Sequence, residues 1–417
     1  MATLEARLAE LEKRLSNQAE ASPAQAAAAP QPSAPLLKVE WKGSPRFVEQ
    51  DRTFKVKGRI QADANYVSAP GELTDKGLGF SSEFRRIRLG GEGDLGGGFG
   101  YKLELELSDN SVDLVDTFVT WRKGPLLVTL GNQNQFQSLD ELTGDTSGSF
   151  MERAAFTDAF NFERRLGLSA QYRKGIVLTQ LGIFTDDVTA LANSSDGPTG
   201  GDENNGYSID SRLMVAPKFG PTQLHFGASV HWRHLGRISD SPVRYRQRPY
   251  IHSSNSRLIG TRDLRVQQEL SYGSEFGFVS GRWHGAAEAH WLRVSRLGGA
   301  TPRFGGAYAE IGYFLTDDSR PYDNGIFGGT KPRNPLGKGG IGALQLNFRY
   351  DYLDLNSGDV RGGTQNAYLV ALVWTPLQYL RFNLNYGYLD YSGAAPLPDG
   401  RTSYGLHVLG SRFELDF

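Results

Sequence analysis

Long stretches of this chain alternate apolar with polar residues, and this period of two constrains the fold more than any other feature of the sequence. In residues 380–388 every even position is apolar, while Arg381, Asn383 and Asn385 occupy odd positions between them. The same alternation occurs in residues 54–66, 99–108, 224–233 and 344–352. Since successive side chains of a β-strand point to opposite faces, each stretch predicts a strand with one apolar and one polar face.

The turns between these stretches indicate how the strands are connected. Short turns rich in Gly and Pro, such as residues 95–98 and 376–378, alternate with longer polar connections, as at the two rims of an outer-membrane barrel. We therefore predict an all-β fold, a 16-stranded antiparallel transmembrane β-barrel. Its strands are expected at about residues 53–67, 83–95, 99–109, 112–123, 126–134, 163–173, 175–185, 206–217, 222–235, 262–281, 284–296, 303–316, 340–354, 364–376, 379–391 and 404–417.

Other folds fit this pattern less well. The longest apolar run, from Tyr368 to Trp374, has seven residues, whereas a membrane-spanning helix needs about 18. A β-sandwich would hide the apolar faces in a core about 10 Å thick. A propeller would show a repeat of about 40–50 residues, which is not visible here. One predicted strand, residues 364–376, is apolar on both faces and fits a barrel wall less well.

The first 52 residues have a different character from the rest. Leu4, Leu8, Leu11 and Leu15 form a helical seam of about two heptads, so residues 1–18 are predicted to be a short helical or coiled-coil segment. It is either a frayed charged tail or a small oligomeric coiled coil, because so short a helix is not stable alone. Residues 19–52 are an Ala/Pro-rich linker that leads to the barrel, residues 53–417. The N-terminus lacks the apolar region of a secretory signal, and we expect a leader to have been removed.

Few motifs point to catalysis or to a cofactor. Residues 91–96 match GxGxxG, but a strand is predicted to follow them instead of a helix, so we interpret them as a barrel turn. His231 and His234 have no carboxylate beside them that would favour a metal site, and Ser147 has no arguable His/Asp partner. The chain has no Cys, which excludes disulfides and thiolate chemistry. We therefore predict no enzyme activity, no cofactor and no metal site.

The charges are balanced overall but unevenly distributed. The formal net charge is −1, which gives no indication of a nucleic-acid partner, and 33 of the 45 basic residues are Arg. Between residues 231 and 265, eight Arg stand against two acidic residues. Acidic residues gather instead between Asp186 and Asp210, where a solvated external loop is favoured over a calcium site because the EF-hand spacing is missing.

Within the basic stretch, arginines alternate strictly with other residues. Arg244, Arg246 and Arg248 flank Tyr245 and Gln247. In an extended chain this spacing places three guanidinium groups on one side, about 6.6 Å apart. Such groups repel one another, and Arg binds phosphate through bidentate hydrogen bonds, so the track predicts an anionic partner. The alternative is that these arginines face outward, where they contact lipopolysaccharide phosphates or keep a loop soluble.

With these features the sequence resembles the phosphate-selective porins of the O and P type, from Phe54 to Phe417. The resemblance is carried by Ser82-Glu-Phe-Arg-Arg-Ile-Arg-Leu-Gly, Gly131-Asn-Gln-Asn-Gln-Phe-Gln-Ser-Leu-Asp-Glu-Leu-Thr, Phe150-Met-Glu-Arg153, Tyr313-Phe-Leu-Thr, Gly342-Ala-Leu-Gln-Leu-Asn-Phe-Arg-Tyr, Tyr352-Leu-Asp-Leu and the alternating arginines. The family implies a trimeric sixteen-stranded barrel in the Gram-negative outer membrane. Its third and fifth loops and one long periplasmic turn would fold into the lumen.

The resemblance also implies an arginine ladder that leads anions to a constriction with lysines. The ladder residues would be Arg59, Arg85, Arg86, Arg153, Arg244, Arg246 and Arg248. Residues 317–339 match the inward periplasmic turn and carry Lys331, Arg333 and Lys338. The third loop, from Asn132 to Asn161, contains no Lys, so we expect anion passage but not strict phosphate selectivity.

We therefore expect an outer-membrane porin through which small anions, such as phosphate or polyphosphate, diffuse passively. The expected partners are these anions, lipopolysaccharide and outer-membrane lipid, and two further copies of the chain in a homotrimer. The alternative is a structural or adhesive outer-membrane barrel, tethered to the periplasm or cell wall through the N-terminal coil. Conductance separates the two, because a purely structural barrel should be closed or unselective.

Overall fold

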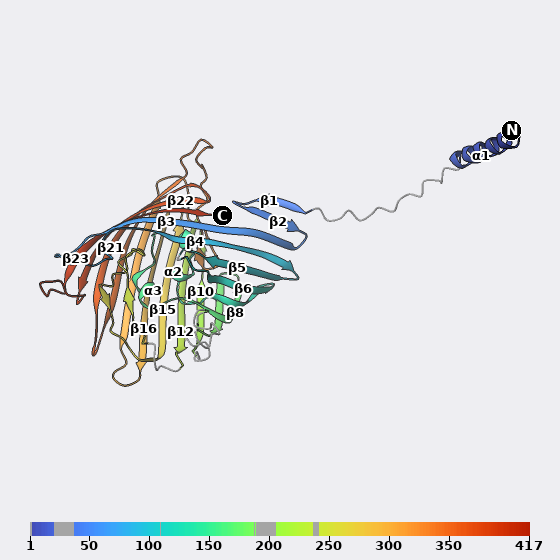
Figure 1. Ribbon diagram of the computed structural model, residues 1–417. Coiled ribbons are helices and arrows are strands. Elements are labelled where there is room, and N and C mark those ends of the chain that lie inside the picture. The colour runs from blue at the N-terminus through green and yellow to red at the C-terminus, as the bar shows by residue number, and fades with distance from the viewer. Residues whose placement is uncertain (1, 21–36, 109, 187, 189–205, 237–241) are drawn as a thin grey trace. The chain divides into compact units, whose positions relative to one another are not determined.

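The computed structural model describes the chain except for residues 1, 21–36, 109, 187, 189–205 and 237–241 (Figure 1). The chain divides into two compact units, Met1–Lys38 and Val39–Phe417. The first contains the helix α1 (Ala2–Glu20), on which Leu8 and Leu11 are exposed. The side chains of Leu4 and Leu15, and residues 21–36 of the predicted linker, lie outside the described residues. The coiled coil therefore stays a prediction.

The second unit is a closed antiparallel barrel of sixteen strands, as the sequence predicted. The strands are β3 (Arg52–Val67), β4 (Gly79–Gly96), β5 (Phe99–Glu106), β6 (Asp113–Lys123), β7 (Leu126–Asn134), β8 (Arg164–Lys174), β9 (Val177–Phe184), β10 (Tyr207–Val215), β12 (Thr222–His234), β15 (Val266–Ser280), β16 (Trp283–Arg296), β17 (Arg303–Phe314), β20 (Ala343–Ser357), β21 (Val360–Leu377), β22 (Leu380–Ser392) and β23 (Tyr404–Asp416). Each pairs with the next, and β23 pairs with β3 to close the ring. Closure leaves no strand edge unpaired within the ring.

Shorter elements accompany the ring. They are β1 (Lys38–Trp41), β2 (Pro45–Glu49), β11 (Lys218–Phe219), β13 (Arg246–Gln247), β14 (Ile259–Gly260), β18 (Tyr322–Asp323), β19 (Ile326–Phe327), α2 (Leu139–Leu142), the 3₁₀ helix η1 (Asp145–Ser147) and α3 (Ala155–Ala159). β2 pairs with the first residues of β3, just beyond the point where β23 ends. α2 and α3 lie inside the ring of strands (Figure 1).

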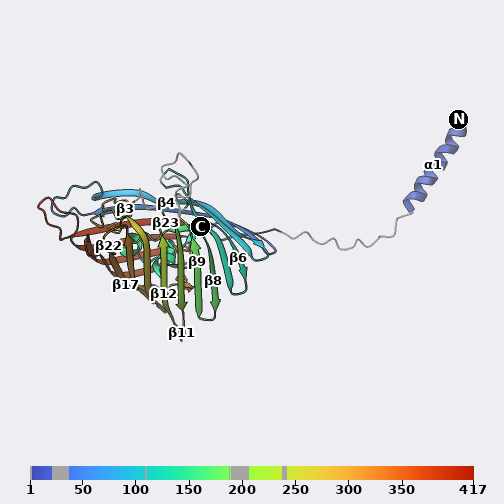
Figure 2. The ribbon, with the colours of Figure 1, turned by 90° about the horizontal axis from the view of Figure 1, so that it is seen from below.

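The two rims of the barrel differ in their connections. One rim has short turns, such as residues 124–125 between β6 and β7, and the other has long loops, including residues 135–163 and 235–265. Figure 2 shows the turn between β8 and β9 at the short-turn rim. Among the described residues, no helix is both long and apolar enough to cross a membrane. By its loop lengths, the long-loop rim is the extracellular one.

Three segments fold into the barrel and cover part of its inner wall. They belong to residues 135–163, residues 242–260 and the turn of residues 315–342 between β17 and β20. Phe150, Phe156, Tyr245, Ile251 and Phe327 from these segments share one buried apolar cluster with residues of β16, β17 and β20–β23. The barrel is therefore narrowed by protein packed against one side of its wall.

This packing explains the strand that is apolar on both faces. The inner face of β21 carries Ala367, Leu369 and Ala371, which belong to the same buried cluster as the infolded segments. Its outer face carries residues such as Tyr368, which is exposed. A strand with lipid on one side and a folded loop on the other has no water-facing side, so both of its faces are apolar.

Glycines in the wall let the loops approach closely. At Gly306 of β17 an added Cβ would lie 2.7 Å from the Cβ of Phe156, a distance that side chains do not tolerate. Any larger residue at this position would push α3 away from the wall.

The face assignment predicts different outcomes for two adjacent residues of β22. Leu384 is on the outer face, 49% exposed, and Asn385 faces inward. A charge on the lipid face of a barrel costs about 2–4 kcal/mol near mid-membrane. Leu384→Arg should therefore reduce the folded fraction and the free energy of unfolding, measured by heat-modifiability gels and urea titration, whereas Asn385→Arg should change them much less. Equal effects at both positions would show that the face assignment is wrong.

Candidate functional site

The segment 135–163, here called the constriction loop, is fastened to the wall by hydrogen bonds at the start of α2. The Ser138 hydroxyl accepts from the Glu141 amide at 2.9 Å as a helix cap. The amides of Leu139 and Asp140 donate to the carboxylate of Glu288 on β16, at 2.9 and 2.7 Å. A single wall carboxylate thus satisfies two amides of a helix start, where negative charge is favoured.

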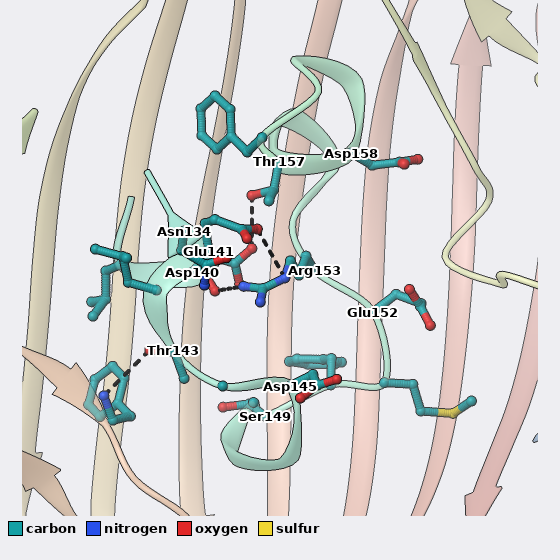
Figure 3. Close-up of a pocket in the computed structure, with 18 of the residues that line it drawn as sticks. Asn134, Asp140, Glu141, Thr143, Asp145, Ser149, Glu152, Arg153, Thr157 and Asp158 are labelled. Carbon is teal, nitrogen blue, oxygen red and sulfur yellow. Dashed lines mark hydrogen bonds and ion pairs between the residues drawn. The ribbon is translucent and has the colours of Figure 1, made fainter. Parts of the chain in front are cut away.

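The one basic residue of the constriction loop is held by acids of the same loop (Figure 3). The Nε of Arg153 lies 3.2 Å from the carboxylate of Glu141, and its Nη1 donates to the backbone carbonyl of Asp140. The Asp140 carboxylate accepts from the Thr157 hydroxyl at 2.9 Å. Burial raises the pKa of Glu141, although Arg153 opposes this shift. Much of the charge of Arg153 is therefore already compensated.

The wall opposite this loop carries closely spaced arginines, because β4 contains a β-bulge. Gln61 of β3 pairs with Arg86 and Ala62 pairs with Phe84, so Arg85 is the extra residue. A bulge disturbs the regular alternation of side chains. Arg85 and Arg86 consequently both line the cavity inside the barrel, together with Arg88.

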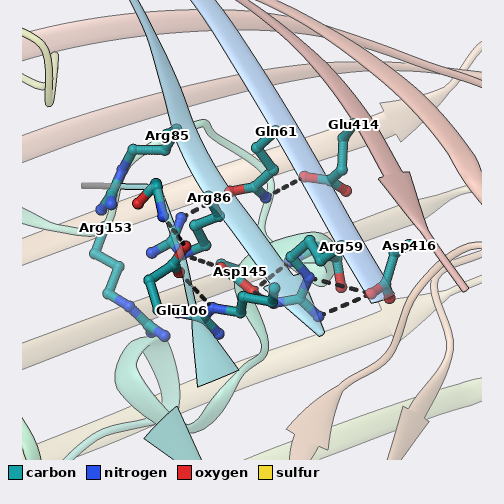
Figure 4. A network of polar contacts seen from close by, with 12 residues as sticks. Arg59, Gln61, Arg85, Arg86, Glu106, Asp145, Arg153, Glu414 and Asp416 are labelled. Carbon is teal, nitrogen blue, oxygen red and sulfur yellow. Dashed lines mark hydrogen bonds and ion pairs between the residues drawn. The ribbon is translucent and has the colours of Figure 1, made fainter. Parts of the chain in front are cut away.

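Asp145 of the constriction loop joins two of these strands (Figure 4). Its carboxylate lies 2.6 Å from Nη1 of Arg59 on β3 and 2.9 Å from Nε of Arg86 on β4. Burial alone would raise the pKa of Asp145, but Arg59 and Arg86 outweigh it and hold that pKa well below its usual range. Asp145 is therefore ionised at any physiological pH.

A second carboxylate of the loop repeats this arrangement. Glu152 lies 3.3 Å from Arg85 and 2.6 Å from Arg412 of β23. Arg412 in turn forms a bidentate pair with Asp63 of β3, at 2.8 Å for each bond. Burial would raise the pKa of Glu152, but the charges of Arg85 and Arg412 lower it strongly. Two loop carboxylates are thus locked onto the β3–β4–β23 wall.

The basic wall continues along β5 and β8. Arg88 pairs with Glu106 at 2.8 Å. Lys102 and Arg164 both pair with Asp116 of β6, each at 2.6 Å. Lys102 also pairs with Glu104, at 3.1 Å. On this part of the wall the three cations Arg88, Lys102 and Arg164 are therefore balanced by the three acids Glu104, Glu106 and Asp116.

The inward turn of residues 315–342 contributes a further arginine. Arg320 donates to the Ser149 hydroxyl and to the Ser147 carbonyl, at 2.7 Å each, and its guanidinium lies 4.1 Å from the ring centroid of Phe327. Arg349 of β20 lies 2.6 Å from Glu310 of β17. The contacts of Arg320 hold Ser147 and Ser149 of the constriction loop against the turn.

The turn itself is pinned by a buried network on the wall. Arg212 of β10 forms a bidentate pair with Glu275 of β15, with distances down to 2.7 Å, and donates to the carbonyl of Gly325 at 3.0 Å. His225 lies 2.6 Å from the Tyr322 hydroxyl and 2.9 Å from Glu275. The position of the turn therefore depends on a polar network in the barrel wall.

A cavity of about 470 Å³ lies between the constriction loop and the wall. Its basic residues outnumber its acidic ones by ten to eight. The basic ones are Arg59, Arg85, Arg86, Arg88, Lys102, Arg153, Arg164, Arg248, Arg320 and Arg349. The acidic ones are Glu104, Asp116, Asp140, Glu141, Asp145, Glu152, Asp158 and Glu310. The cavity is thus a charged passage with a modest positive excess.

The alternating arginines occupy the infolded segment above this cavity. Tyr245 and Gln247 are buried, whereas Arg244 and Arg246 are exposed. Arg244 pairs with Asp263. Arg248 lines the cavity, and its amide donates to Asp158 at 2.7 Å. The alternation therefore leaves all three guanidinium groups on the less buried side of the segment, but only Arg248 reaches the cavity.

Arg257, like Arg248, has guanidinium nitrogens that lack hydrogen-bond partners. The Nε of Arg248 and the Nε and Nη1 of Arg257 are buried and have no hydrogen-bond partner among the described residues. Burial, and then the charges of Arg248 and Arg246, lowers the pKa of Arg257 to about 10. Among the described residues, the acid paired with the Arg248 side chain is Asp158, 3.8 Å away. Buried donors without partners are costly in a folded protein, and an anion would satisfy them.

The structure brings together only some of the residues predicted for the anion path. Arg59, Arg85, Arg86, Arg153 and Arg248 line the cavity. Arg244 and Arg246 lie outside its lining. Lys331, Arg333 and Lys338 are all exposed and also lie outside it, and Arg333 pairs with Asp317 at 3.3 Å. The cation that the inward turn places at the cavity is Arg320.

Several site residues were missed from the sequence. They are Arg88, Lys102, Arg164, Arg257, Arg320 and Arg349. Arg88 and Arg349 stand within quoted family motifs, on the polar side of their strands, so their pattern could have marked them. Arg320 and Arg257 lie in irregular segments, where no periodicity shows the direction of a side chain.

The other motifs noted in the sequence lie on strands of the barrel wall. Residues 91–96 form the end of β4 and pair with β5, as expected of a barrel and not of a nucleotide site. His231 pairs with Asp210 across strands β12 and β10. In the part of the chain that the structure describes, no three His, Asp or Glu side chains are grouped to hold a metal ion. Most of the acidic stretch from Asp186 to Asp210 lies outside the described residues.

Comparisons with known proteins agree with this architecture. A family model described as phosphate-selective porin O and P matches residues 54–417. A protein of Caulobacter vibrioides, itself uncharacterized, is 60% identical over 438 aligned positions that cover 100% of this chain and 89% of the relative.

Solved structures share the fold at low sequence identity. An anion-selective porin from Comamonas acidovorans has a TM-score of 0.53 and 12% identity, over 88% of this chain and 100% of that one. The outer-membrane protein OmpT of Vibrio cholerae, in a trimer form, has a TM-score of 0.54 and 10% identity, over 88% of this chain and 100% of that one. At these identities the likeness concerns the fold alone.

Asp145 provides a test of the cavity as an ion path. Asp145→Asn removes one negative charge, and a unit charge about 10 Å from an ion in water changes its energy by about 0.4 kcal/mol, or about twofold in population. The anion-to-cation permeability ratio, from the reversal potential under a salt gradient, should therefore rise by about twofold or more. Asp399→Asn, at the outer rim, serves as the control and should leave the ratio unchanged.

The difference in permeability ratio between the parent and Asp145→Asn has a pH dependence that follows from the lowered pKa of Asp145. A carboxyl with a depressed folded pKa contributes stability above its unfolded pKa of about 4 and loses it only as the pH falls through the folded value. The selectivity difference between the parent and Asp145→Asn should consequently persist from pH 7 to pH 3, where a carboxyl with the ordinary pKa of about 4 is mostly protonated. A difference that vanished between pH 5 and pH 3 would show that Asp145 is not held by Arg59 and Arg86.

Proposed function

We propose that this chain, which belongs to the phosphate-selective porin O and P family, conducts small anions across the Gram-negative outer membrane by passive diffusion. The chain is an outer-membrane β-barrel porin, and its fold and family indicate a channel and not a catalyst. In this proposal anions pass from the extracellular vestibule, along Arg246, Arg248 and Arg257, to the cavity beside the constriction loop.

The observation that carries the proposal is the group of buried guanidinium nitrogens without partners on Arg248 and Arg257. Most cavity arginines are paired with carboxylates, so they determine the shape of the cavity and contribute only a modest excess of positive charge. Arg248, which lines the cavity, and its neighbour Arg257 instead have buried donors without partners. Donors in a confined, partly dehydrated path can replace part of the hydration shell of an anion, which lowers the barrier to its passage.

We propose phosphate or polyphosphate as the favoured anion because of the geometry of the donors. A guanidinium group offers two parallel N–H bonds that match two phosphate oxygens. The constriction loop contains no Lys, and its Arg153 is held by Glu141. The loop itself therefore offers little for a tight phosphate site, and we propose a preference for phosphate in place of strict selectivity. Weak binding at successive sites also allows ions to leave.

The test replaces the arginines of the proposed path. Arg246→Ala, Arg248→Ala and Arg257→Ala together should lower the anion-to-cation permeability ratio severalfold and weaken the block of chloride current by phosphate, in planar bilayers. The backbone amide of Arg248 that bonds Asp158 is unchanged, so the fold should remain. Arg244→Ala is the matched control, since Arg244 is already paired with Asp263.

Lysine replacements separate charge from donor geometry. With Lys at positions 246, 248 and 257, the positive charge is kept but the bidentate fork is lost. The anion preference should then persist while the phosphate block weakens. If both the alanine and the lysine triple variants conduct as the parent does, the anion path lies elsewhere and the proposal is wrong.

We further propose that the chain forms a homotrimer. A Vibrio cholerae outer-membrane protein of the same fold is described in a trimer form. The helix α1 exposes Leu8 and Leu11, which a coiled coil between copies would cover. Because two heptads are weak, the barrel wall should dominate assembly.

Deletion of residues 1–35 tests which part drives assembly. The truncated protein should still migrate as heat-sensitive trimers on a gel, with a lower dissociation temperature at most. A monomer after this deletion would show that the N-terminal helix and not the barrel wall holds the copies together. A monomeric full-length chain would contradict the trimer itself.

A further inference from the structure

Two arginines face each other on the outside of the barrel near its extracellular rim. Arg293 of β16 and Arg303 of β17 are directly opposite in the register of the two strands. Their neighbours Leu292, Val294 and Phe304 are buried in the inner cluster, so the two arginines, both exposed, point away from the lumen. They therefore play no part in lining the channel.

A third arginine lies at the same height. In the pairing of β17 with β20, Gly305 stands opposite Asp354, so Arg303 comes level with Asn356. Asn356 is in turn opposite Arg361 of β21, which is exposed. Adjacent strands are about 4.8 Å apart, so the three arginines form a row about 15 Å long across four strands. We call Arg293, Arg303 and Arg361 the outer arginine row.

The acids near this row are engaged elsewhere. Asp359 pairs with Arg262 at 2.7 Å and with Arg296 at 2.6 Å. The Asp354 carboxylate accepts from the amide and side chain of Asn356, at 2.9 and 3.0 Å. In the described part of the chain, the outer arginine row has no ion pair. Like charges directly opposite on neighbouring strands are destabilising, so an unpaired pair of this kind indicates an anion supplied from outside.

The height of the row relative to the membrane identifies that anion. Two positions below Arg293, Trp291 is 44% exposed, and its ring stacks on that of Tyr272, 5.6 Å away, which is 43% exposed. Exposed aromatic rings on a barrel's outer face mark the membrane interface. The arginines are about 7 Å above these rings, at two strand residues of 3.4 Å each. This is the level of lipid headgroups in the outer leaflet.

We propose that the outer arginine row binds the phosphate groups of lipid A, the glycolipid anchor of lipopolysaccharide. Lipid A carries two phosphates on a rigid disaccharide, and a row of guanidinium groups can bind both at once. Arg is suited to this because it forms bidentate bonds with phosphate and sheds water readily. The stacked rings of Trp291 and Tyr272 lie where the sugar and the acyl chains would rest. The bound lipid would sit on the outer wall without entering the channel.

The experiment measures binding of purified lipid A to the full-length protein in detergent. The test variant is Arg293→Ala, Arg303→Ala and Arg361→Ala combined. The matched control is Arg122→Ala, Arg262→Ala and Arg401→Ala, which removes the same charge from exposed positions outside the row. Native mass spectrometry with diphosphoryl and monophosphoryl lipid A gives the affinities, and heat-modifiability gels verify folding.

Affinity for diphosphoryl lipid A should fall at least tenfold in the test variant and less than twofold in the control. The parent should bind monophosphoryl lipid A several times more weakly than the diphosphoryl form. Phosphate block of chloride current should be unchanged in the test variant, which separates this site from the channel. If the triple variant folds poorly, Arg303→Gln alone should still weaken diphosphoryl lipid binding. Equal affinities of parent and folded variants, or equal binding of both lipids, would overturn the proposal.

Discussion

The interior of this barrel depends on ion pairs between an infolded loop and the wall. Asp145 bridges Arg59 and Arg86, and Glu152 bridges Arg85 and Arg412. The loop is held against the wall by these carboxylates and also by apolar residues such as Phe150 and Phe156, which belong to the buried cluster. Removal of one partner from a buried ion pair typically costs about 3–5 kcal/mol. The width of the channel is therefore set by electrostatic contacts as much as by packing.

Arginines that are paired with carboxylates in this way can bind a passing anion only weakly. A guanidinium group whose donors are already bound to a carboxylate attracts an anion only through the small remaining excess of charge. Arg248 and Arg257 differ because they retain buried donors without partners. Some arginines therefore shape the passage, and others can bind an anion inside it. The number of arginines alone overstates the affinity of the channel for anions.

The inner and outer faces of the barrel wall have different surroundings, and the residue types on each strand differ accordingly. The inner face of β22 and β23 carries polar residues such as Asn383 and Arg412 together with members of the buried apolar cluster such as Leu389 and Leu406, and the outer face contacts lipid. β21 is apolar on both faces because a folded loop replaces water on its inner side. At the extracellular end of β16, the outer face changes from the aromatic Trp291 to the basic Arg293 within two residues, which fits the proposed change of surroundings from acyl chains to headgroups. Each change of residue type follows a change in the surrounding medium.

The sequence by itself determined the barrel, since the period of two sets strand direction and number regardless of what fills the lumen. Through the resemblance to the family it also predicted Arg59, Arg85 and Arg86 for the lumen, and all three line the cavity. It could not place Lys331, Arg333 and Lys338, because an irregular turn has no periodicity, and the structure exposes all three. Only the tertiary structure decided which arginines remain available, because pairing with carboxylates far away in the sequence, such as Arg85 with Glu152 and Arg59 with Asp416, 67 and 357 residues apart, depends on how the chain folds back into the ring.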